Sequence, residues 1–278
     1  MKSIGFIDFY LSEWHANNYP AWLSEVNEKN GTDFAVKYAW AEQEVSPRDG
    51  VTSAQWCEKF GVELCSSLEE LCEKSDYLLI LAPSDPEKHL QYAKTALKYG
   101  KPTYIDKTFA PNSAEAEEIA ALAKKYNTPM FSTSALRYGP ELSEMKDVKN
   151  VITAGSGSSA NEYLVHQLEM IVKLMGVDAK KIKAETQGNQ GIYRVDYGNG
   201  SMATAVYAPT LPFAVCIETY DGKSVSKEIS WGYFETLIEK ILTFYETGEV
   251  DFDISETLTV MKLRERLLAN AGEWEDLQ

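Results

Sequence analysis

The sequence predicts an α/β fold in which a doubly wound parallel sheet is followed by an α+β domain with a mostly antiparallel sheet. Two observations support this prediction. Up to about residue 137, short apolar runs alternate with amphipathic helical segments, which is typical of strand–helix–strand units. Beyond that residue, alternating runs are joined by Asn-Gly and Asp-Gly turns, which favour antiparallel hairpins. The 278 residues therefore fit two domains, expected over 1–137 and 138–278.

The first half is predicted to be Rossmann-like, with six strands and well-marked helix ends. The expected strands cover residues 3–9, 33–40, 62–65, 76–82, 102–106 and 129–134. Ser67 and Ser84, each followed three residues later by Glu, form capping boxes that predict helix starts, and Asn112 or Ser113 predicts another. Gly100 predicts a helix end, because glycine readily adopts the left-handed conformation found there.

The second half is predicted to combine a few strands with helices. A short helix (139–146) and a strand (148–154) come first. Ser159 and Gly176 are expected to begin and end the next helix. Strands in IYRVDY, MATAVY and FAVCIETY follow, and two amphipathic helices, about 232–246 and 254–270, finish the chain.

Composition restricts the class of partner. The net charge of −15 argues against nucleic acid and against anionic membrane surfaces, since both are bound by basic patches. No apolar run has the length of a signal peptide or a membrane span. The four cysteines form no C-x-x-C pair and no metal-like spacing, so we expect reduced thiols in a cytoplasmic protein that binds a small molecule.

The segment PTYIDKTFAPN places Asp106 and Lys107 at the carboxyl end of a predicted strand, where open α/β sheets bind their ligands. A lysine at that place can donate a hydrogen bond to a substrate hydroxyl or take part in moving its proton. An ordinary surface lysine leaving a strand explains the tripeptide equally well.

The predicted helix after Ser159 carries Glu162, His166, Glu169 and Lys173 on one stripe, because successive members are four, three and four residues apart. A histidine with a carboxylate one turn away on each side is held in one tautomer and can act as acid or base. The alternative is a solvent-exposed face of ordinary ion pairs, with Glu162 only capping the helix. One histidine and two carboxylates are a weak metal signal, and no metal is predicted.

Taken together, these stretches resemble the Gfo/Idh/MocA family of NAD(P)-dependent sugar and polyol oxidoreductases. In the first half the resemblance rests on Ala82-Pro83, His89, Gly100-Lys101 and Asp106-Lys107-Thr108. In the second half, Glu162, His166, Glu169 and Gly176 match the family's Asp-x-x-x-His-x-x-Asp helix with Glu in place of Asp, and ALRYGP (135–140) is similar to its Arg-containing link. The order and spacing of the motifs carry the resemblance over nearly the whole chain.

The resemblance implies that Lys107 and His166 face a substrate hydroxyl beside a nicotinamide ring, with Glu162 orienting His166. It also implies NAD or NADP as cofactor, a polyhydroxy substrate, and a homodimer or homotetramer. The residues expected at the cofactor are Asp8, Phe9, Tyr10, Trp40, Pro83, Ser84, His89, Asp106 and Arg137. Arg137 is expected at either substrate or cofactor, His89 has a structural role as its alternative, and His15 is given no role.

The turn after the first strand departs from the family pattern. A dinucleotide site uses G-x-G-x-x-G so that the backbone and a helix N-terminus can approach the pyrophosphate. Aligned on this strand, the three glycines become Asp8, Tyr10 and Glu13. Asn17 or Asn18 before Pro20 predicts a late helix start, after a loop of roughly ten residues. The aromatic residues Tyr10, Trp14 and Trp40 either pack in the core or fill the space of the adenosine.

Two interpretations of different class follow. In the first, the protein transfers hydride between NAD(P) and a hydroxyl of a sugar, inositol or related polyol, and holds the cofactor in an altered way. In the second, it is a family member that does not bind dinucleotide, and is a small-molecule binding or regulatory protein or a non-redox epimerase or lyase that reuses Lys107 and His166.

Overall fold

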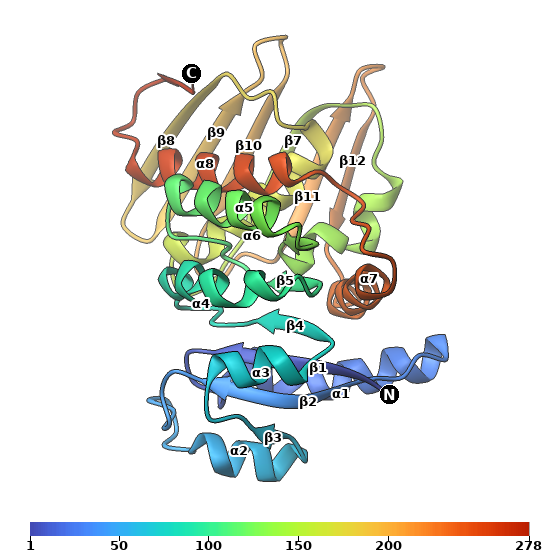
Figure 1. The fold of residues 1–278 in the computed structure, drawn as a ribbon. Helices are drawn as coiled ribbons and strands as arrows, with labels where there is room; N and C mark the ends of the chain where they lie inside the picture. Colours follow the sequence, from blue (N-terminus) through green and yellow to red (C-terminus); the bar gives the residue numbers. More distant parts are fainter. Residues whose placement is uncertain (278) are drawn as a thin grey trace. The chain divides into compact units, whose positions relative to one another are not determined.

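The structure, a computed structural model, describes residues 1–277. The chain forms two compact units, and Figure 1 shows the elements of both. Unit 1 consists of Met1–Ser132 and Leu237–Asp251, and unit 2 consists of Thr133–Thr236 with the described part of Phe252–Gln278. The first unit ends five residues before the predicted boundary at 137, and it also takes in a helical segment near the end of the chain.

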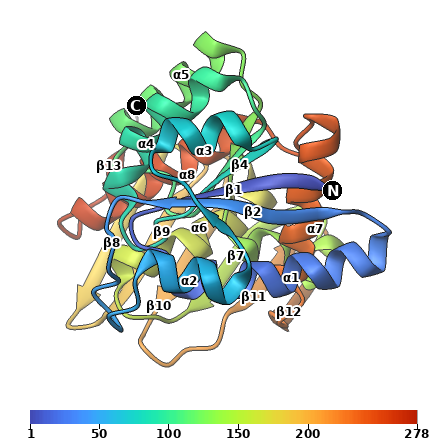
Figure 2. The same cartoon turned by 60° about the horizontal axis from the view of Figure 1, so that its bottom comes forward.

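Unit 1 contains a six-stranded sheet in the order β3-β2-β1-β4-β5-β6, and all of its neighbouring strands are parallel. The strands are β1 (Lys2–Asp8), β2 (Phe34–Ala41), β3 (Glu63–Leu64), β4 (Tyr77–Ile80), β5 (Thr103–Ile105) and β6 (Met130–Ser132). The helices are α1 (Trp14–Asn30), α2 (Ser53–Phe60), α3 (Leu68–Lys74), η1 (Pro86–Lys88), α4 (His89–Ala96), η2 (Leu97–Tyr99), α5 (Ser113–Tyr126) and most of α7 (Tyr233–Thr247). Figure 2 shows α1 and α2 on one side of the sheet and α3, α4 and α5 on the other. This is the doubly wound sheet that the sequence predicts.

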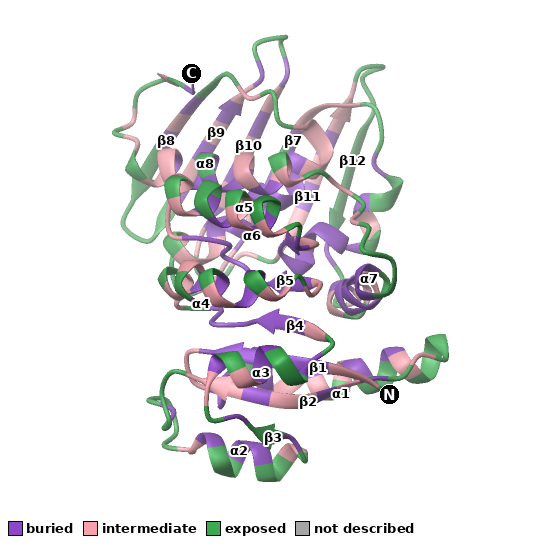
Figure 3. Cartoon of the chain, viewed as in Figure 1, coloured by how far each residue is buried: buried purple, intermediate pink, exposed green. Residues whose placement is uncertain are grey.

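The central strand β1 is buried on both faces because helices cover both sides of a parallel sheet. Ile4, Phe6 and Ile7 are fully buried, and Figure 3 shows β1 and β4 as mostly buried strands. Gly5 is required there, since a Cβ at this position would lie 2.3 Å from Ser75 Oγ. The apolar run that contains Ile4, Phe6 and Ile7 therefore forms a central strand of the sheet.

Most of the predicted helix ends in unit 1 are confirmed. Ser67 accepts a hydrogen bond from Glu70 N at 3.1 Å, Asn112 accepts one from Glu115 N at 2.9 Å, and Gly100 ends η2 with a φ of 66°. The predicted cap at Ser84 is wrong, because η1 begins at Pro86 and has Asp85 at its N-cap position without a side-chain hydrogen bond.

The late start predicted for α1 is also wrong. The helix begins at Trp14, and Pro20 lies inside it. The cause is Glu13, whose carboxylate caps the helix and so shortens the loop after β1 to residues 9–13. Glutamate is not among the preferred N-cap residues, whereas Asn followed by Pro is a common start signal, so the sequence pattern favoured the wrong site.

Unit 2 contains a seven-stranded sheet in the order β12-β11-β7-β10-β9-β8-β13, in which only β7 and β10 are parallel neighbours among the described pairs. The strands are β7 (Val148–Gly155), β8 (Lys181–Gln187), β9 (Gln190–Asp196), β10 (Met202–Tyr207), β11 (Ala214–Thr219), β12 (Ser224–Glu228) and β13 (Glu275–Asp276). Its helices are η3 (Ala135–Tyr138), η4 (Pro140–Glu144), α6 (Ala160–Met175) and α8 (Ile254–Ala269). The mostly antiparallel second sheet is confirmed, with short 3₁₀ turns where a helix over 139–146 was expected.

The segment 237–251 belongs to unit 1 because the aromatic side chains of α7 pack there. The ring of Phe244 meets that of Phe131 edge-on at 4.8 Å, and the ring of Tyr245 stacks on that of Tyr77 at 4.7 Å. The Tyr245 hydroxyl also donates a hydrogen bond to Leu78 O at 2.8 Å. A chain segment distant in sequence thus completes the core of unit 1. Within residues 1–277, no helix is long and apolar enough to cross a membrane.

Candidate functional site

The candidate site of unit 1 lies at the carboxyl ends of β1, β4 and β5. Asp8 ends β1, Ala82 and Pro83 follow β4, and Asp106 and Lys107 follow β5. In the strand order β3-β2-β1-β4-β5-β6, the sheet reverses its direction of growth between β1 and β4. Ligands of open α/β sheets bind in the crevice at such a reversal. Asp106 and Lys107 are therefore at the edge where the sequence predicts them.

The carboxyl group of Asp8 bridges the ends of β1 and β4. Its Oδ1 accepts hydrogen bonds from Phe9 N at 2.7 Å and from Ala82 N at 3.0 Å, while its Oδ2 is buried without a hydrogen-bond partner. Burial, together with the nearby carboxylate of Glu13, raises the pKa of Asp8 well above its usual value. A protein carboxyl group thus occupies the crevice between the two strands.

A second carboxylate occupies the N-terminus of α1. Glu13 is only 4% exposed, and its side chain accepts hydrogen bonds from His15 N at 2.7 Å and from Ala16 N. Burial raises the pKa of Glu13, although the nearby His15 acts in the opposite direction. Free N–H groups at a helix start are what bind a phosphate in a dinucleotide site. Here two of those groups are already engaged by the protein.

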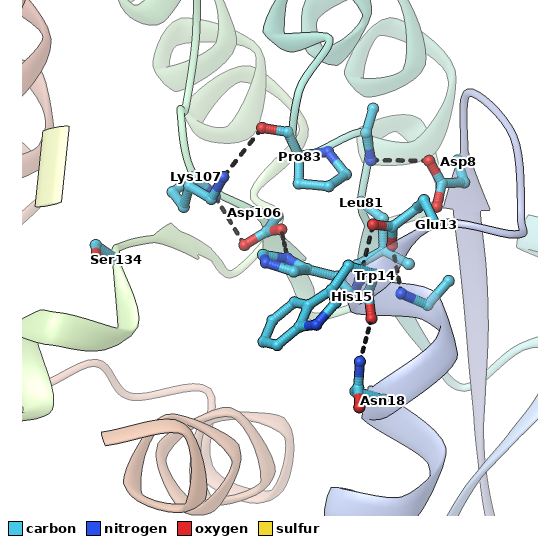
Figure 4. A network of polar contacts seen from close by, with 12 residues as sticks. Asp8, Glu13, Trp14, His15, Asn18, Leu81, Pro83, Asp106, Lys107 and Ser134 are labelled. Carbon is cyan, nitrogen blue, oxygen red and sulfur yellow. Dashed lines mark hydrogen bonds and ion pairs between the residues drawn. The ribbon is translucent and has the colours of Figure 1, made fainter. Parts of the chain in front are cut away.

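The side chain of His15 contacts Asp106, which lies 91 residues further along the chain (Figure 4). The contact joins His15 Nδ1 to Asp106 Oδ2, while Asp106 Oδ1 accepts a hydrogen bond from Lys107 N at 2.9 Å. Burial disfavours the charge on Asp106, but the contact with His15 outweighs it, so the pKa of Asp106 is lowered. His15, given no role by sequence reasoning, is thus part of a buried acid–base pair.

Lys107 is largely buried, and its ammonium group donates a hydrogen bond to Pro83 O at 3.2 Å (Figure 4). The lysine therefore joins the ends of β4 and β5, and it is not the surface lysine of the alternative interpretation. Ser84, the next residue after Pro83, is exposed.

His89 lies at the start of α4 and is fully buried. Its Nδ1 contacts Phe109 O at 3.1 Å and its Nε2 contacts Leu81 O at 2.5 Å. Burial lowers the pKa of His89. Both ring nitrogens are thus engaged by main-chain carbonyls, and this geometry favours the structural role over the predicted cofactor contact.

Aromatic and charged side chains fill the region beyond the end of β2. Trp40 meets the ring of Tyr92 edge-on at 5.7 Å, and Glu42 accepts hydrogen bonds from Lys88 Nζ at 2.6 Å and from the Tyr92 hydroxyl at 3.0 Å. The Lys88 ammonium group also lies 4.7 Å from the centre of the Phe9 ring. In dinucleotide-binding sheets an acidic residue in this region binds the adenosine ribose, whereas Glu42 is already paired with protein groups.

The other two aromatic residues of the first turn pack against their neighbours. The ring of Tyr10 lies 5.9 Å from that of Phe9, and the ring of Trp14 lies 5.4 Å from that of Trp22. Trp14 is 43% exposed, so it is not a core residue.

The candidate site of unit 2 is centred on His166 of α6. The Ser134 hydroxyl lies 2.6 Å from His166 Nδ1 and also accepts a hydrogen bond from Leu136 N at 3.2 Å. The carboxylate of Glu162 accepts a hydrogen bond from Ser158 Oγ. Its expected role in orienting His166 stays a prediction. Sequence reasoning missed Ser134, because it lies 32 residues before His166 and outside any recognisable motif.

The alternative of a solvated stripe on α6 is wrong, because Glu169 is buried. Glu169 accepts hydrogen bonds from Thr133 Oγ1 at 3.0 Å and Ser134 N at 3.3 Å, and it pairs with Arg137 at 3.4 Å. Burial raises the pKa of Glu169, against the lowering effect of the Arg137 charge. The polar stripe is therefore buried at Glu169, whereas Glu162, His166 and Lys173 are half-buried.

The guanidinium group of Arg137 is fixed within unit 2. It pairs with Glu169 and Glu256, and it lies 3.9 Å from the centre of the Phe252 ring. Burial opposes the charge on Arg137, yet the two carboxylates hold its pKa above the usual value. These contacts hold Arg137 within unit 2, and the substrate or cofactor contact expected from the sequence stays a prediction.

Known proteins share part of the sequence pattern and the fold of this chain. Residues 35–133 match the Gfo/Idh/MocA family model, described as an oxidoreductase family with an NAD-binding Rossmann fold. The match covers 99 of the 278 residues, from the second residue of β2 to the residue after β6. The oxidoreductase YhhX of Escherichia coli (strain K12) is 36% identical over 63 residues, which are 23% of this chain. The chain matches 18% of the length of that curated relative.

Solved structures show the same fold as this chain. A putative myo-inositol dehydrogenase from Sinorhizobium meliloti 1021 has a TM-score of 0.79 at 11% identity and covers 100% of both chains. GenD2 from gentamicin A biosynthesis, in complex with NAD, has a TM-score of 0.78 at 11% identity and covers 100% of this chain and 96% of its own. Biliverdin reductase from Synechocystis, with biliverdin and NADP⁺, has a TM-score of 0.67 at 14% identity and covers 96% and 98%.

The residues of this chain do not fit a dinucleotide at the place where doubly wound sheets usually bind it. The family match begins at residue 35, after the turn that carries Asp8 and Glu13. In that turn the helix N–H groups are taken by Glu13, and the crevice between β1 and β4 holds a buried carboxyl oxygen of Asp8 that has no donor. A pyrophosphate would meet two carboxyl groups in place of three glycines. Residues 1–277 contain no group of three or more His, Cys, Asp or Glu side chains that could hold a metal ion.

Proposed function

We propose that this protein carries out acid–base chemistry on a polyhydroxylated small molecule, in the manner of an epimerase or lyase, without a nicotinamide dinucleotide at the turn after β1. One observation carries the proposal, namely the engagement of the α1 N-terminus by the Glu13 carboxylate. The buried Asp8 carboxyl group supports it. The polyhydroxy substrate class rests on the match to the Gfo/Idh/MocA family model and on the fold shared with a putative myo-inositol dehydrogenase.

Charge repulsion by the carboxyl groups of Asp8 and Glu13 disfavours a pyrophosphate in the turn after β1. A carboxylate and a phosphate charge about 4 Å apart repel each other by about 4 kcal/mol at an effective dielectric constant of about 20. That energy corresponds to roughly a thousandfold loss of affinity. A neutral, protonated Asp8 would avoid the repulsion, but its side chain would still fill the space that glycine leaves open for the backbone to approach the ligand.

Hydride transfer between NAD(P) and a substrate hydroxyl is the second candidate function. The family description as NAD-binding favours it, as does the position of Lys107 at the carboxyl edge of the sheet. Hydride transfer requires a cofactor position that does not displace the Glu13 carboxylate from the N-terminus of α1.

A calorimetric titration with NADH and with NADPH separates the two candidates. We expect no heat of binding for the wild-type protein at millimolar cofactor. The double variant Asp8→Asn/Glu13→Gln removes both carboxyl charges at nearly constant size, so it is expected to bind more tightly than wild type. Micromolar binding by the wild-type protein would overturn the proposal in favour of hydride transfer.

We also propose a homo-oligomer formed through the sheet of unit 2. Helices α6 and α8 pack on one face of this sheet, and Ile152 of β7, in the interior of the sheet, is nevertheless 50% exposed. Contiguous exposed apolar surface marks association sites, and Ile152 is the apolar side chain through which we test whether the open face of this sheet is such a site. Size-exclusion chromatography with light scattering measures the molar mass in solution and so tests the homo-oligomer. The Ile152→Lys variant is expected to be monomeric.

A further inference from the structure

We propose that His15 is a catalytic acid–base residue, oriented by Asp106, and that its substrate is a hydroxycarbonyl compound such as a ketose or a keto-inositol. This inference rests on the proposed function and deepens it, because it names the residue that moves the proton and the chemical class on which it acts.

The contact with Asp106 gives the imidazole a defined orientation. Asp106 is buried and its carboxylate can only accept, so His15 Nδ1 is the donor in their contact. In the neutral ring the lone pair then belongs to Nε2, which is the atom that can take a proton from a ligand. An aspartate that fixes the tautomer of a histidine and stabilises its protonated form is the arrangement that acid–base enzymes use.

His15 is also held by its backbone and by its neighbours. Its N–H donates to the Glu13 carboxylate at 2.7 Å. Its ring lies 5.1 Å from that of Trp14 and 6.0 Å from that of Tyr19, measured between ring centres. The ring therefore stands on the first turn of α1, at the carboxyl edge of the sheet where ligands of this fold class bind.

The second buried histidine of unit 1 provides a contrast. Both ring nitrogens of His89 contact main-chain carbonyls, and the residue is fully buried, whereas His15 contacts a carboxylate and is 8% exposed. A histidine that only ties strands together has the environment of His89. The ring of His15, with a carboxylate partner at Nδ1, has the arrangement by which acid–base enzymes orient a histidine.

Lys107 supplies the positive charge that the reaction needs. Its ammonium group has three N–H donors, of which one is directed to Pro83 O at 3.2 Å. Its charge also lowers the pKa of the neighbouring Asp106. An ammonium group at this edge can donate a hydrogen bond to the carbonyl oxygen of a substrate, where negative charge develops when a neighbouring carbon loses its proton.

The proposed step moves one proton and two electron pairs. His15 Nε2 takes the proton from the hydroxyl-bearing carbon next to the carbonyl group. The electron pair of the broken C–H bond forms a carbon–carbon double bond, and the carbonyl π pair moves onto oxygen, which accepts the hydrogen bond of Lys107. Return of the proton from the imidazolium to the same carbon restores the substrate, with deuterium at that carbon when the imidazolium has exchanged with D₂O. If the planar enolate turns over in the site before the proton returns, the carbon is inverted. No oxidant or reductant is consumed.

Deuterium exchange tests the inference on the full-length protein. Dihydroxyacetone, D-fructose and 2-keto-myo-inositol are incubated with the protein in D₂O, and the loss of the C–H signals next to the carbonyl is followed by NMR. We expect exchange above the uncatalysed rate for at least one of these compounds. His15→Asn and Asp106→Asn are expected to slow it about 100-fold or more, the usual loss when a general base is removed. Trp22→Phe, in the same helix, is the control and should exchange at the wild-type rate.

A second measurement separates a lost base from a lost fold. The chain has only three histidines, so the ring-nitrogen NMR signals of His15 can be assigned by single substitutions. We expect the Nδ1–H tautomer in the wild-type protein and a change of tautomer in Asp106→Asn, while the signals of His89 persist. Absence of exchange with all three compounds, or full exchange in His15→Asn, overturns the inference. Exchange that appears only with added NAD⁺ would overturn the proposed function and leave the role of His15 standing.

Discussion

The carboxyl group of Asp8 accepts a hydrogen bond from Ala82 N at 3.0 Å and so joins the ends of β1 and β4. These two strands flank the point at which the sheet reverses its order, where a doubly wound sheet normally leaves room for a ligand's phosphates. Ala82 itself has a left-handed backbone with a φ of 55°, which is uncommon for a residue with a Cβ. The doubly wound fold is thus retained, while its usual anion site is filled by an acidic side chain.

Replacing Asp8 by Asn should raise stability at high pH. Burial holds the pKa of Asp8 above that of the unfolded chain, so the native state keeps a proton that the unfolded state releases. The free energy of unfolding of the wild type therefore falls as pH rises from about 4 towards the native pKa. The amide side chain of the variant cannot titrate, and urea unfolding at about pH 8.5 should show a gain of about 1 kcal/mol or more that shrinks at about pH 5.5. Asp178→Asn, at an exposed site, is the control; an equal gain at both pH values would contradict the pKa shift.

Glu13→Ala should destabilise the protein through the loss of a helix cap. The substitution leaves His15 N and Ala16 N without their acceptor at the start of α1, and lost caps cost about 1 kcal/mol. Glu13→Gln keeps an acceptor oxygen and should lose less. Thermal unfolding of the two variants measures the difference, and equal melting temperatures for Glu13→Ala and wild type would show that the cap is dispensable.

Arg137→Met should be strongly destabilising, because it leaves the buried Glu169 without its cation. Removing one partner of a buried ion pair lowers the free energy of unfolding by about 3–5 kcal/mol. The double variant Arg137→Met/Glu169→Gln removes both charges and should recover part of that loss. Urea unfolding of the two variants tests the coupling, and a double variant no more stable than Arg137→Met would argue against the pair.

Ser134→Ala should release His166 from its fixed orientation. The serine hydroxyl lies 2.6 Å from His166 Nδ1, so its removal deletes a hydrogen bond worth about 1 kcal/mol. The ring-nitrogen NMR signals of His166 are expected to shift, and Ser134→Thr should preserve them. Unchanged His166 signals in Ser134→Ala would assign its orientation to another neighbour.

The local pattern of the sequence was sufficient to predict the strands of unit 1 and the edge at which Asp106 and Lys107 lie. β1 and β2 lie within one residue of their predicted ends, because a central parallel strand is apolar on both faces and so stands out in the sequence. The His166 helix and its ends at Ser159 and Gly176 were predicted for a similar reason, since capping residues and helical spacing are properties of a single segment.

Segments distant in the sequence decide the rest. His15 meets Asp106 only because the sheet brings the ends of β1 and β5 to the same edge, and no spacing in the sequence reports that pairing. Glu169 belongs to a polar stripe on α6, and packing within unit 2, not the stripe, determines that it is buried against Arg137. The sequence by itself therefore determined the fold, which depends on local periodicity. The tertiary structure decided which charged groups meet, because burial and strand order set the partner and the protonation of each.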